Sequence, residues 1–177
     1  PLLDRSHKIT ASDMVHGAFN PPYANSDSVI VGDGGEYFTS VVAYNTNVPS
    51  SGTFYYGVPY LFEYKFSPIV MKLAEQPVTD GRLQLRNMTV TFNDVGTFQT
   101  IVTHKARNAK LTTFNANTLD STSSTLSQIS IGSGSYRFSV LGEASGVDVV
   151  LRNFAYTPCT FQSAEWEGIF NTRNRRI

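Results

Sequence analysis

GRLQLRNMTVTFNDVGTFQT, residues 81–100, is the stretch that indicates the fold class. Its large apolar residues fall in two phases of a two-residue period, Leu83 and Leu85 in one and Met88, Val90 and Phe92 in the other. The change of phase near Arg86 and Asn87 predicts a β-bulge within a long strand. Turn-forming residues at 93–96 then precede a second strand, 97–104, so we expect these two strands to form a hairpin.

Other segments also predict strands. Residues 136–140 and 147–151 alternate between apolar and polar side chains on either side of a turn at 142–146, which predicts a second hairpin. We expect further strands at 28–31, 37–44, 60–66 and 161–170. Ser67 and Pro68 provide the one credible helix start, for a helix that ends by residue 74. The fold class is therefore all-β, an antiparallel sandwich or barrel-like module with long loops and at most one or two short helices.

The pattern divides the chain into two parts. Residues 1–51 contain turn clusters around short strands and resemble an N-terminal arm or linking segment, whereas residues 52–177 form an antiparallel β domain. Within that domain, residues 105–133 are poor in large apolar side chains, and we expect a long Ser/Thr-rich loop around residues 117–133.

Composition indicates a protein that acts through assembly. The 177 residues are 41% hydrophobic but only 16% charged, against about 25% in an average domain. Lys plus Arg equals Asp plus Glu at 14 each, so no overall field attracts nucleic acid or an anionic membrane. No apolar run approaches the roughly 18 residues that a membrane helix needs. Because the chain begins with Pro1 and not with Met, we expect a piece of something longer.

Few residues have the spacing of a reactive site. The single cysteine, Cys159, excludes an internal disulfide, and we interpret it as a small, half-buried hydrophobic residue. His7, His16 and His104 lack metal-ligand spacing, so we expect no metal and no cofactor. VGDGGE at residues 31–36 lacks the lysine and the following helix of a phosphate-binding loop, and we interpret it as a hairpin turn.

Glu165 and Glu167 are the sharpest enzymatic signal. They flank Trp166, the only tryptophan, and lie on one face of a strand about 6.5 Å apart, near the lower end of the carboxylate separation in inverting glycosidases. Any pair of carboxylates two residues apart on a strand has this spacing, however. We therefore favour a solvated face or an ion pair between subunits over catalysis.

Aromatic residues recur on one face of the strand at 60–66, at Tyr60, Phe62, Tyr64 and Phe66. Such a row is typical of a core or an interface, although aromatic rows also stack sugars or unpaired bases. In the last strand, Trp166 lies in phase with Ala164 and Phe170, and we expect it to be buried, with Trp166→Ala costing roughly 3 to 5 kcal/mol.

The final residues supply the interface candidates Arg173, Arg175 and Arg176, with Trp166 beside them. Arginine pairs bidentately with carboxylates and is enriched in interfaces, so we expect contacts with a neighbouring subunit or protein. Binding to double-stranded DNA is the weaker alternative, because one short cluster on a neutral protein neutralises few phosphates.

Three stretches together resemble one known family: YLFEYKFSPIVMK at residues 60–72, the stretch at 81–100 quoted above, and FQSAEWEGIFNTRNRRI at residues 161–177. Over residues 60–177 the chain resembles the C-terminal part of the tail tubular protein B, or tail nozzle, family of short-tailed bacteriophages (podoviruses).

The resemblance implies a virion structural protein that is made in the host cytoplasm and built into the tail. Six copies would form a ring that attaches to the tail adaptor ring (tail tubular protein A), contacts the tail fibres and meets the host envelope. The ring would conduct double-stranded DNA during genome ejection without sequence-specific binding. The resemblance implies no catalytic residues, so we expect no enzyme. The alternative is a carbohydrate-binding or polysaccharide-hydrolysing tail module that uses the aromatic residues with Glu165 and Glu167.

Overall fold

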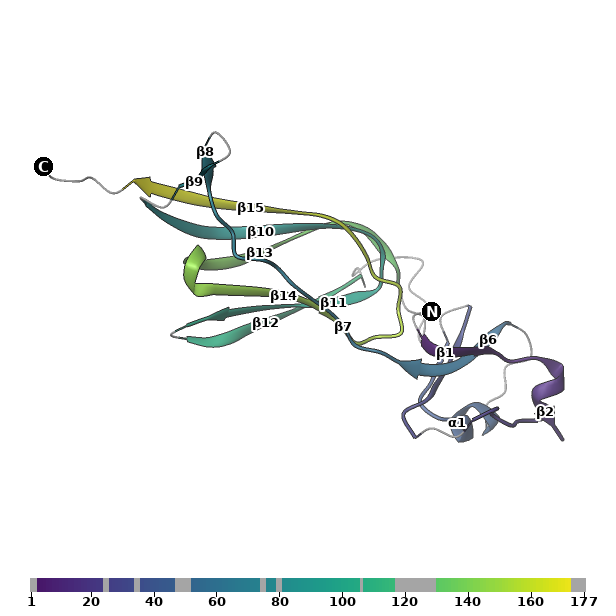
Figure 1. Ribbon diagram of the computed structural model, residues 1–177. Helices are drawn as coiled ribbons and strands as arrows, with labels where there is room; N and C mark the ends of the chain where they lie inside the picture. Colours follow the sequence, from purple (N-terminus) through teal and green to yellow (C-terminus); the bar gives the residue numbers. More distant parts are fainter. Residues whose placement is uncertain are drawn as a thin grey trace, which may run out of the picture.

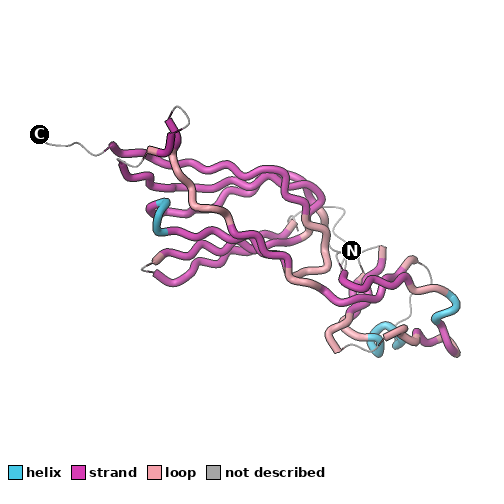
Figure 2. Tube along the Cα trace, in the orientation of Figure 1, coloured by secondary structure: helices cyan, strands magenta, loops and turns pink. Residues whose placement is uncertain are grey.

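The computed structural model describes residues 3–23, 26–33, 36–46, 52–73, 76–78, 81–105, 107–116 and 130–172. These residues form a β-sandwich and a smaller N-terminal unit, which lie end to end (Figures 1 and 2). Antiparallel strands dominate both units, which confirms the expected all-β class.

The sandwich consists of two facing antiparallel sheets. The first has the strand order β13-β10-β15 and the second the order β12-β11-β14-β7. Their bounds are β7 Phe62–Lys65, β10 Gly81–Val95, β11 Thr97–His104, β12 Arg107–Asn115, β13 Gly132–Glu143, β14 Val147–Asn153 and β15 Thr160–Thr172. The core between the sheets includes Val90, Phe98, Val102 and Leu151, each at most 2% exposed. A small hairpin, β8 Lys72–Leu73 with β9 Gln76–Pro77, lies beside one end of the sandwich (Figure 1).

The N-terminal unit has its own sheet, in the order β1-β6-β4-β5. Its elements are β1 Leu3–Lys8, η1 Ala11–Asp13, β2 Met14–Val15, β3 Ala18–Phe19, β4 Val29–Gly32, β5 Tyr37–Phe38, α1 Val41–Thr46 and β6 Phe54–Pro59. Buried aromatic rings of Phe19, Tyr44, Phe54 and Tyr56 pack around Ile30. Residues 54–59 are expected in the C-terminal domain, but in the structure this strand pairs with β1 and β4.

The two units touch through aromatic residues. Tyr156, which follows β14, stacks on Tyr37 of β5 with ring centroids 4.4 Å apart and ring planes 4° from parallel. It also packs against the buried residues Leu3, Val29 and Val31.

The bulge in β10 is confirmed, because the register shifts between Leu85 and Asn87 in the ladders with both neighbouring strands.

The first predicted hairpin is wrong, since β10 and β11 belong to opposite sheets. The reason is visible in the rings of Phe92 and Phe98, which meet edge-on across the core with centroids 5.6 Å apart and ring planes 64° apart. Side chains on adjacent strands of one hairpin would stand side by side instead. Gly96 forms the corner where the chain changes sheets.

The second predicted hairpin is wrong for the same reason. Strands β13 and β14 lie in different sheets, and the short 3₁₀ turn η2, Ala144–Gly146, carries the chain across. Strand β11 instead forms a hairpin with β12. Strand β12 lies within residues 105–133, the stretch poor in large apolar side chains, and was not expected as a strand; most of the expected loop at residues 117–133 lies outside the described residues.

The helix expected from Ser67 is also wrong. Residues 66–71 run extended across one side of the sandwich, where the Phe66 amide donates to the Val149 carbonyl (3.0 Å) and Ile69 packs against the core. The α-helix of the described residues is α1, which replaces the second half of the strand expected at 37–44. The Ser40 hydroxyl accepts a hydrogen bond from the Ala43 amide (3.1 Å), as helix-starting serines do. The strands expected at 28–31 and 161–170 are confirmed as β4 and β15.

Candidate interaction surfaces

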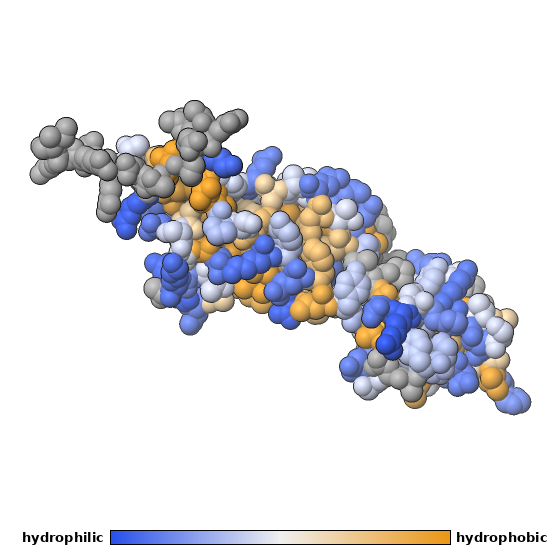
Figure 3. Space-filling model, viewed as in Figure 1, coloured by the Kyte–Doolittle hydropathy of each residue, from blue (hydrophilic) through white to orange (hydrophobic). Residues whose placement is uncertain are grey.

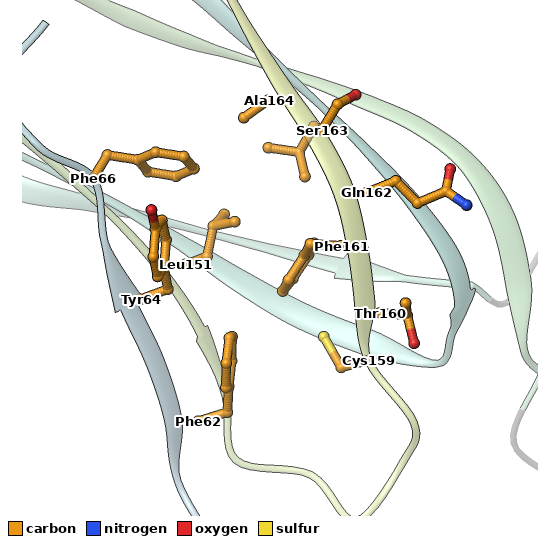
Figure 4. A pocket seen from close by; sticks show the side chains of 11 residues that line it. Phe62, Tyr64, Phe66, Leu151, Cys159, Thr160, Phe161, Gln162, Ser163 and Ala164 are labelled. Atoms are coloured by element: carbon orange, nitrogen blue, oxygen red, sulfur yellow. The ribbon is translucent and has the colours of Figure 1, made fainter.

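An open groove of about 510 Å³ lies between the two sheets, along the side where β7 and β15 are the outermost strands (Figure 4). Phe62, Tyr64 and Phe66 line it from β7 and the residue that follows, and the segment 159–164 lines it from β15 and the residue before. Val90 and Leu151, both buried, form its floor.

The groove is lined mainly by apolar and aromatic side chains. The rings of Phe62 and Phe161 stack across it with centroids 6.1 Å apart, and Phe66 stands edge-on to Tyr64 at 5.0 Å. Figure 4 shows Phe161 and Cys159 directed toward the rings of β7, whereas Gln162 points away. None of the described residues that line the groove carries a charge. Figure 3 shows apolar residues gathering across this side of the sandwich.

Cys159 is half-buried at the edge of the groove, as the sequence analysis expected. Burial raises the pKa of its thiol to about 11, and a hydrogen bond with Asn153 opposes the shift only in part. Because the thiolate is the nucleophilic form, this cysteine behaves as an apolar residue at neutral pH.

The aromatic row of the strand at 60–66 is divided between the groove and solvent. Phe62 and Phe66 are partly buried, whereas Tyr64 is 52% exposed and Tyr60, which precedes β7, is 42% exposed. The row therefore supplies both the wall of the groove and part of the surface that surrounds it.

The expected burial of Trp166 is wrong, because its side chain is 42% exposed. The phase was correct: Trp166 lies opposite Met88, which is 2% exposed, so both point to the core side of the sheet. However, β15 is the outermost strand, with a sheet neighbour on one side only. A large side chain there keeps part of its surface in water, and Trp166 stays an interface candidate.

Glu165 and Glu167 project from the opposite, outer face of β15, since they pair in register with Thr89 and Asn87 and alternate with Trp166. Both are exposed. The Glu167 carboxylate accepts a hydrogen bond from the Arg137 guanidinium and forms an ion pair with it. Neither glutamate lines the apolar groove. A sugar-cleaving site would need the carboxylate pair next to the aromatic residues. In the structure the two groups lie apart.

Other candidates receive no site from the described residues. Arg173, Arg175 and Arg176 lie outside them. In the part of the chain that the structure describes, no three His, Cys, Asp or Glu side chains converge as metal ligands would. His7 instead contacts Asp13 (3.2 Å), and His104 bonds the Val140 carbonyl (2.8 Å). No described helix combines the length and the apolar character that a membrane crossing requires.

Comparison with known proteins decides the family. The model of the bacteriophage nozzle protein family matches residues 17–177. This chain belongs to the bacteriophage nozzle protein family. The tail tubular protein gp12 of Escherichia phage T7 is 33% identical over 128 residues, which cover 70% of this chain and 16% of that relative. The match thus spans less than a fifth of the relative's length.

Membership of the nozzle family makes the chain a structural component of the phage tail, within the virion. It also confirms the resemblance seen at residues 60–177 and extends the match toward the N-terminal unit. Sequence reasoning missed the groove, because it treated the strands at 60–66 and 161–170 separately. The aromatic residues on both strands were the available signal, but their juxtaposition depends on the order of strands in two sheets.

Proposed function

We propose that this nozzle-family chain acts by assembly, as part of a ring at the distal end of the phage tail that conducts double-stranded DNA during genome ejection. The observation that carries the proposal is the family match over residues 17–177. In this proposal the ring is a homo-hexamer that attaches to the tail adaptor ring, contacts the tail fibres and meets the host envelope. The chain performs no catalysis.

The surface chemistry supports a conduit. The outer face of the β13-β10-β15 sheet carries hydroxyl side chains, among them Thr89, Thr91, Ser135 and Ser163, and on this face Arg137 pairs with Glu167. Zero net charge and a hydroxyl-rich surface allow water to cover the wall of a channel without strong binding to phosphates. A channel that gripped DNA would slow its passage.

An ejection assay tests this function. Phage particles are prepared with and without the chain, and DNA release is followed with a dye after exposure to host envelope. Particles that lack the chain should package DNA but fail to deliver it through the envelope. Normal delivery by such particles would contradict the proposal. A polysaccharide-cleaving role is not proposed, since no contact brings Glu165 and Glu167 to the groove.

A further inference from the structure

The sandwich has two open sides that differ in chemistry. The groove side consists of the outer edges of β7 and β15, and the lysine side consists of the outer edges of β12 and β13. On the lysine side the Lys110 amine donates to the Ser139 hydroxyl (2.7 Å), which ties the two sheets together. Lys110 lies opposite the buried Val102, on the core face of β12, and an inward lysine at a sheet edge is a known protection against unwanted strand pairing.

The groove side has no such protection within the described residues. Its lining is uncharged, and Tyr64 and Trp166 leave 52% and 42% of their side chains exposed beside it. Strand β15 is 13 residues long; its residues 160–164 border the groove, whereas near its other end Phe170 lines a hollow with Ile69 of the crossing segment 66–71. A long edge strand next to an open apolar groove is a surface that proteins normally cover with a partner.

The charges that stay unpaired are complementary between the two sides. Within the described sandwich, ion pairs join Lys65 to Asp148, Arg82 to Glu143 and Arg137 to Glu167. Outside these pairs, Glu63 of β7, which lies in register with Arg152 of β14, and Glu165 of β15 are exposed on the groove side. On the lysine side, Arg107 and Lys110 of β12 are exposed without an ion pair among the described residues. Leu111, next to Lys110, is 54% exposed and adds an apolar side chain.

We propose that the groove side docks against the lysine side of a second copy of this chain. In this contact Leu111 of one copy lies on the groove of the other, and Lys110 or Arg107 forms ion pairs with Glu63 and Glu165. The two sides lie at opposite edges of both sheets, so the contact is head-to-tail, and repetition of one head-to-tail contact gives a ring when the rotation between copies closes. This inference rests on the proposed ring, and it names the surfaces that build it.

Cross-linking within assembled tails tests which surfaces meet. Tyr64→Cys and Leu111→Cys are combined in a Cys159→Ser background, because both positions are exposed. A short bismaleimide should then link the copies into a ladder of covalent multimers. Each cysteine alone should give no ladder, since a head-to-tail contact brings together two different positions. The control pairs Tyr64→Cys with Val42→Cys, which is 75% exposed in the N-terminal unit and should give no ladder.

Charge reversal provides the second measurement. Lys110→Glu and Glu165→Lys should each weaken self-association by at least about tenfold, because like charges then face each other across the contact. The double reversal should recover most of that loss. Lys8→Glu, an exposed reversal in the N-terminal unit, is the matched control and should leave assembly unchanged.

The outcomes separate this inference from the function beneath it. If tails assemble and eject DNA normally but the Tyr64/Leu111 pair gives no ladder, the assignment of surfaces is wrong and the proposed function stands. Dimers from a single cysteine would also overturn it, since they indicate a two-fold contact or another partner on the groove. If unmodified tails contain no ring of this chain, the proposed function itself fails.

Discussion

Trp166 and Phe98 are large aromatic side chains on facing sheets, and water reaches them to different extents. Phe98 is 1% exposed in the middle of the core, whereas Trp166 is 42% exposed on an edge strand. Phe98→Ala should therefore lower the free energy of unfolding by about 3 to 5 kcal/mol, because it leaves a cavity. Trp166→Ala should cost only about 1 to 2 kcal/mol, because much of the side chain is already in water.

Urea unfolding of the two variants measures both values under the same conditions. Equal costs would contradict the exposure of Trp166 and restore the buried position expected from its phase. A small cost combined with weakened assembly would identify Trp166 as part of the contact between copies.

Cys159 allows a test of burial at the groove. Its thiol has a pKa raised from an ordinary 9.0 to about 11 by desolvation, so the neutral form is favoured in the folded protein. At pH 8 its alkylation by iodoacetamide should be about a hundredfold slower than that of an ordinary thiol, in proportion to the thiolate fraction. The rate should continue to rise with pH toward 11 and not level off near 9. The urea-unfolded chain is the control, and equal rates for the folded and unfolded chains would contradict the burial.

At the scale of elements, two-residue periodicity identified strands but not the sheets to which they belong. The pattern located β10 with its bulge, β11, β13, β14 and β15, because their core-facing residues alternate. It failed at β12, where Leu111 and Phe114 fall in opposite phases and the edge strand is mostly polar. It also failed at the sheet changes, because a turn sequence reads the same whether the chain returns within one sheet or crosses to the other. The groove depends on those crossings, so it was not predictable.

The corner between β10 and β11 offers a sharp test of the crossing. A Cβ atom added to Gly96 would lie 2.7 Å from the Cβ of Thr157, a residue that is itself buried. Gly96→Ala should therefore destabilise the fold by about 1 to 3 kcal/mol, since the neighbouring chain must shift. Gly134→Ala is the matched control, because nothing lies within 4 Å of the added atom.

Thermal or urea unfolding compares the two alanine variants directly. Gly134→Ala should be neutral or slightly stabilising, as alanine is less costly than glycine within a strand. If Gly96→Ala is equally neutral, the close approach of Thr157 at the corner is contradicted.

At the scale of the whole molecule, two units of unequal size are joined by an aromatic contact, and the larger one offers two chemically different sides. That arrangement suits a chain whose role is to contact neighbours. The C-terminal arginines stay candidates for one such contact. Deleting residues 172–177 should weaken ring assembly or attachment to the tail while leaving the isolated fold largely intact, because the core lies between the sheets. Assembly and infection at the level of the unmodified protein would show that the arginines do not dock.

The central claim is that this chain builds a ring at the distal end of the tail. The most direct test is an image of purified phage particles in which the chain carries a compact label. We expect six labels arranged around the tail axis, at the end farthest from the capsid. Labels missing from the tail, or bound at one site away from the axis, would contradict it.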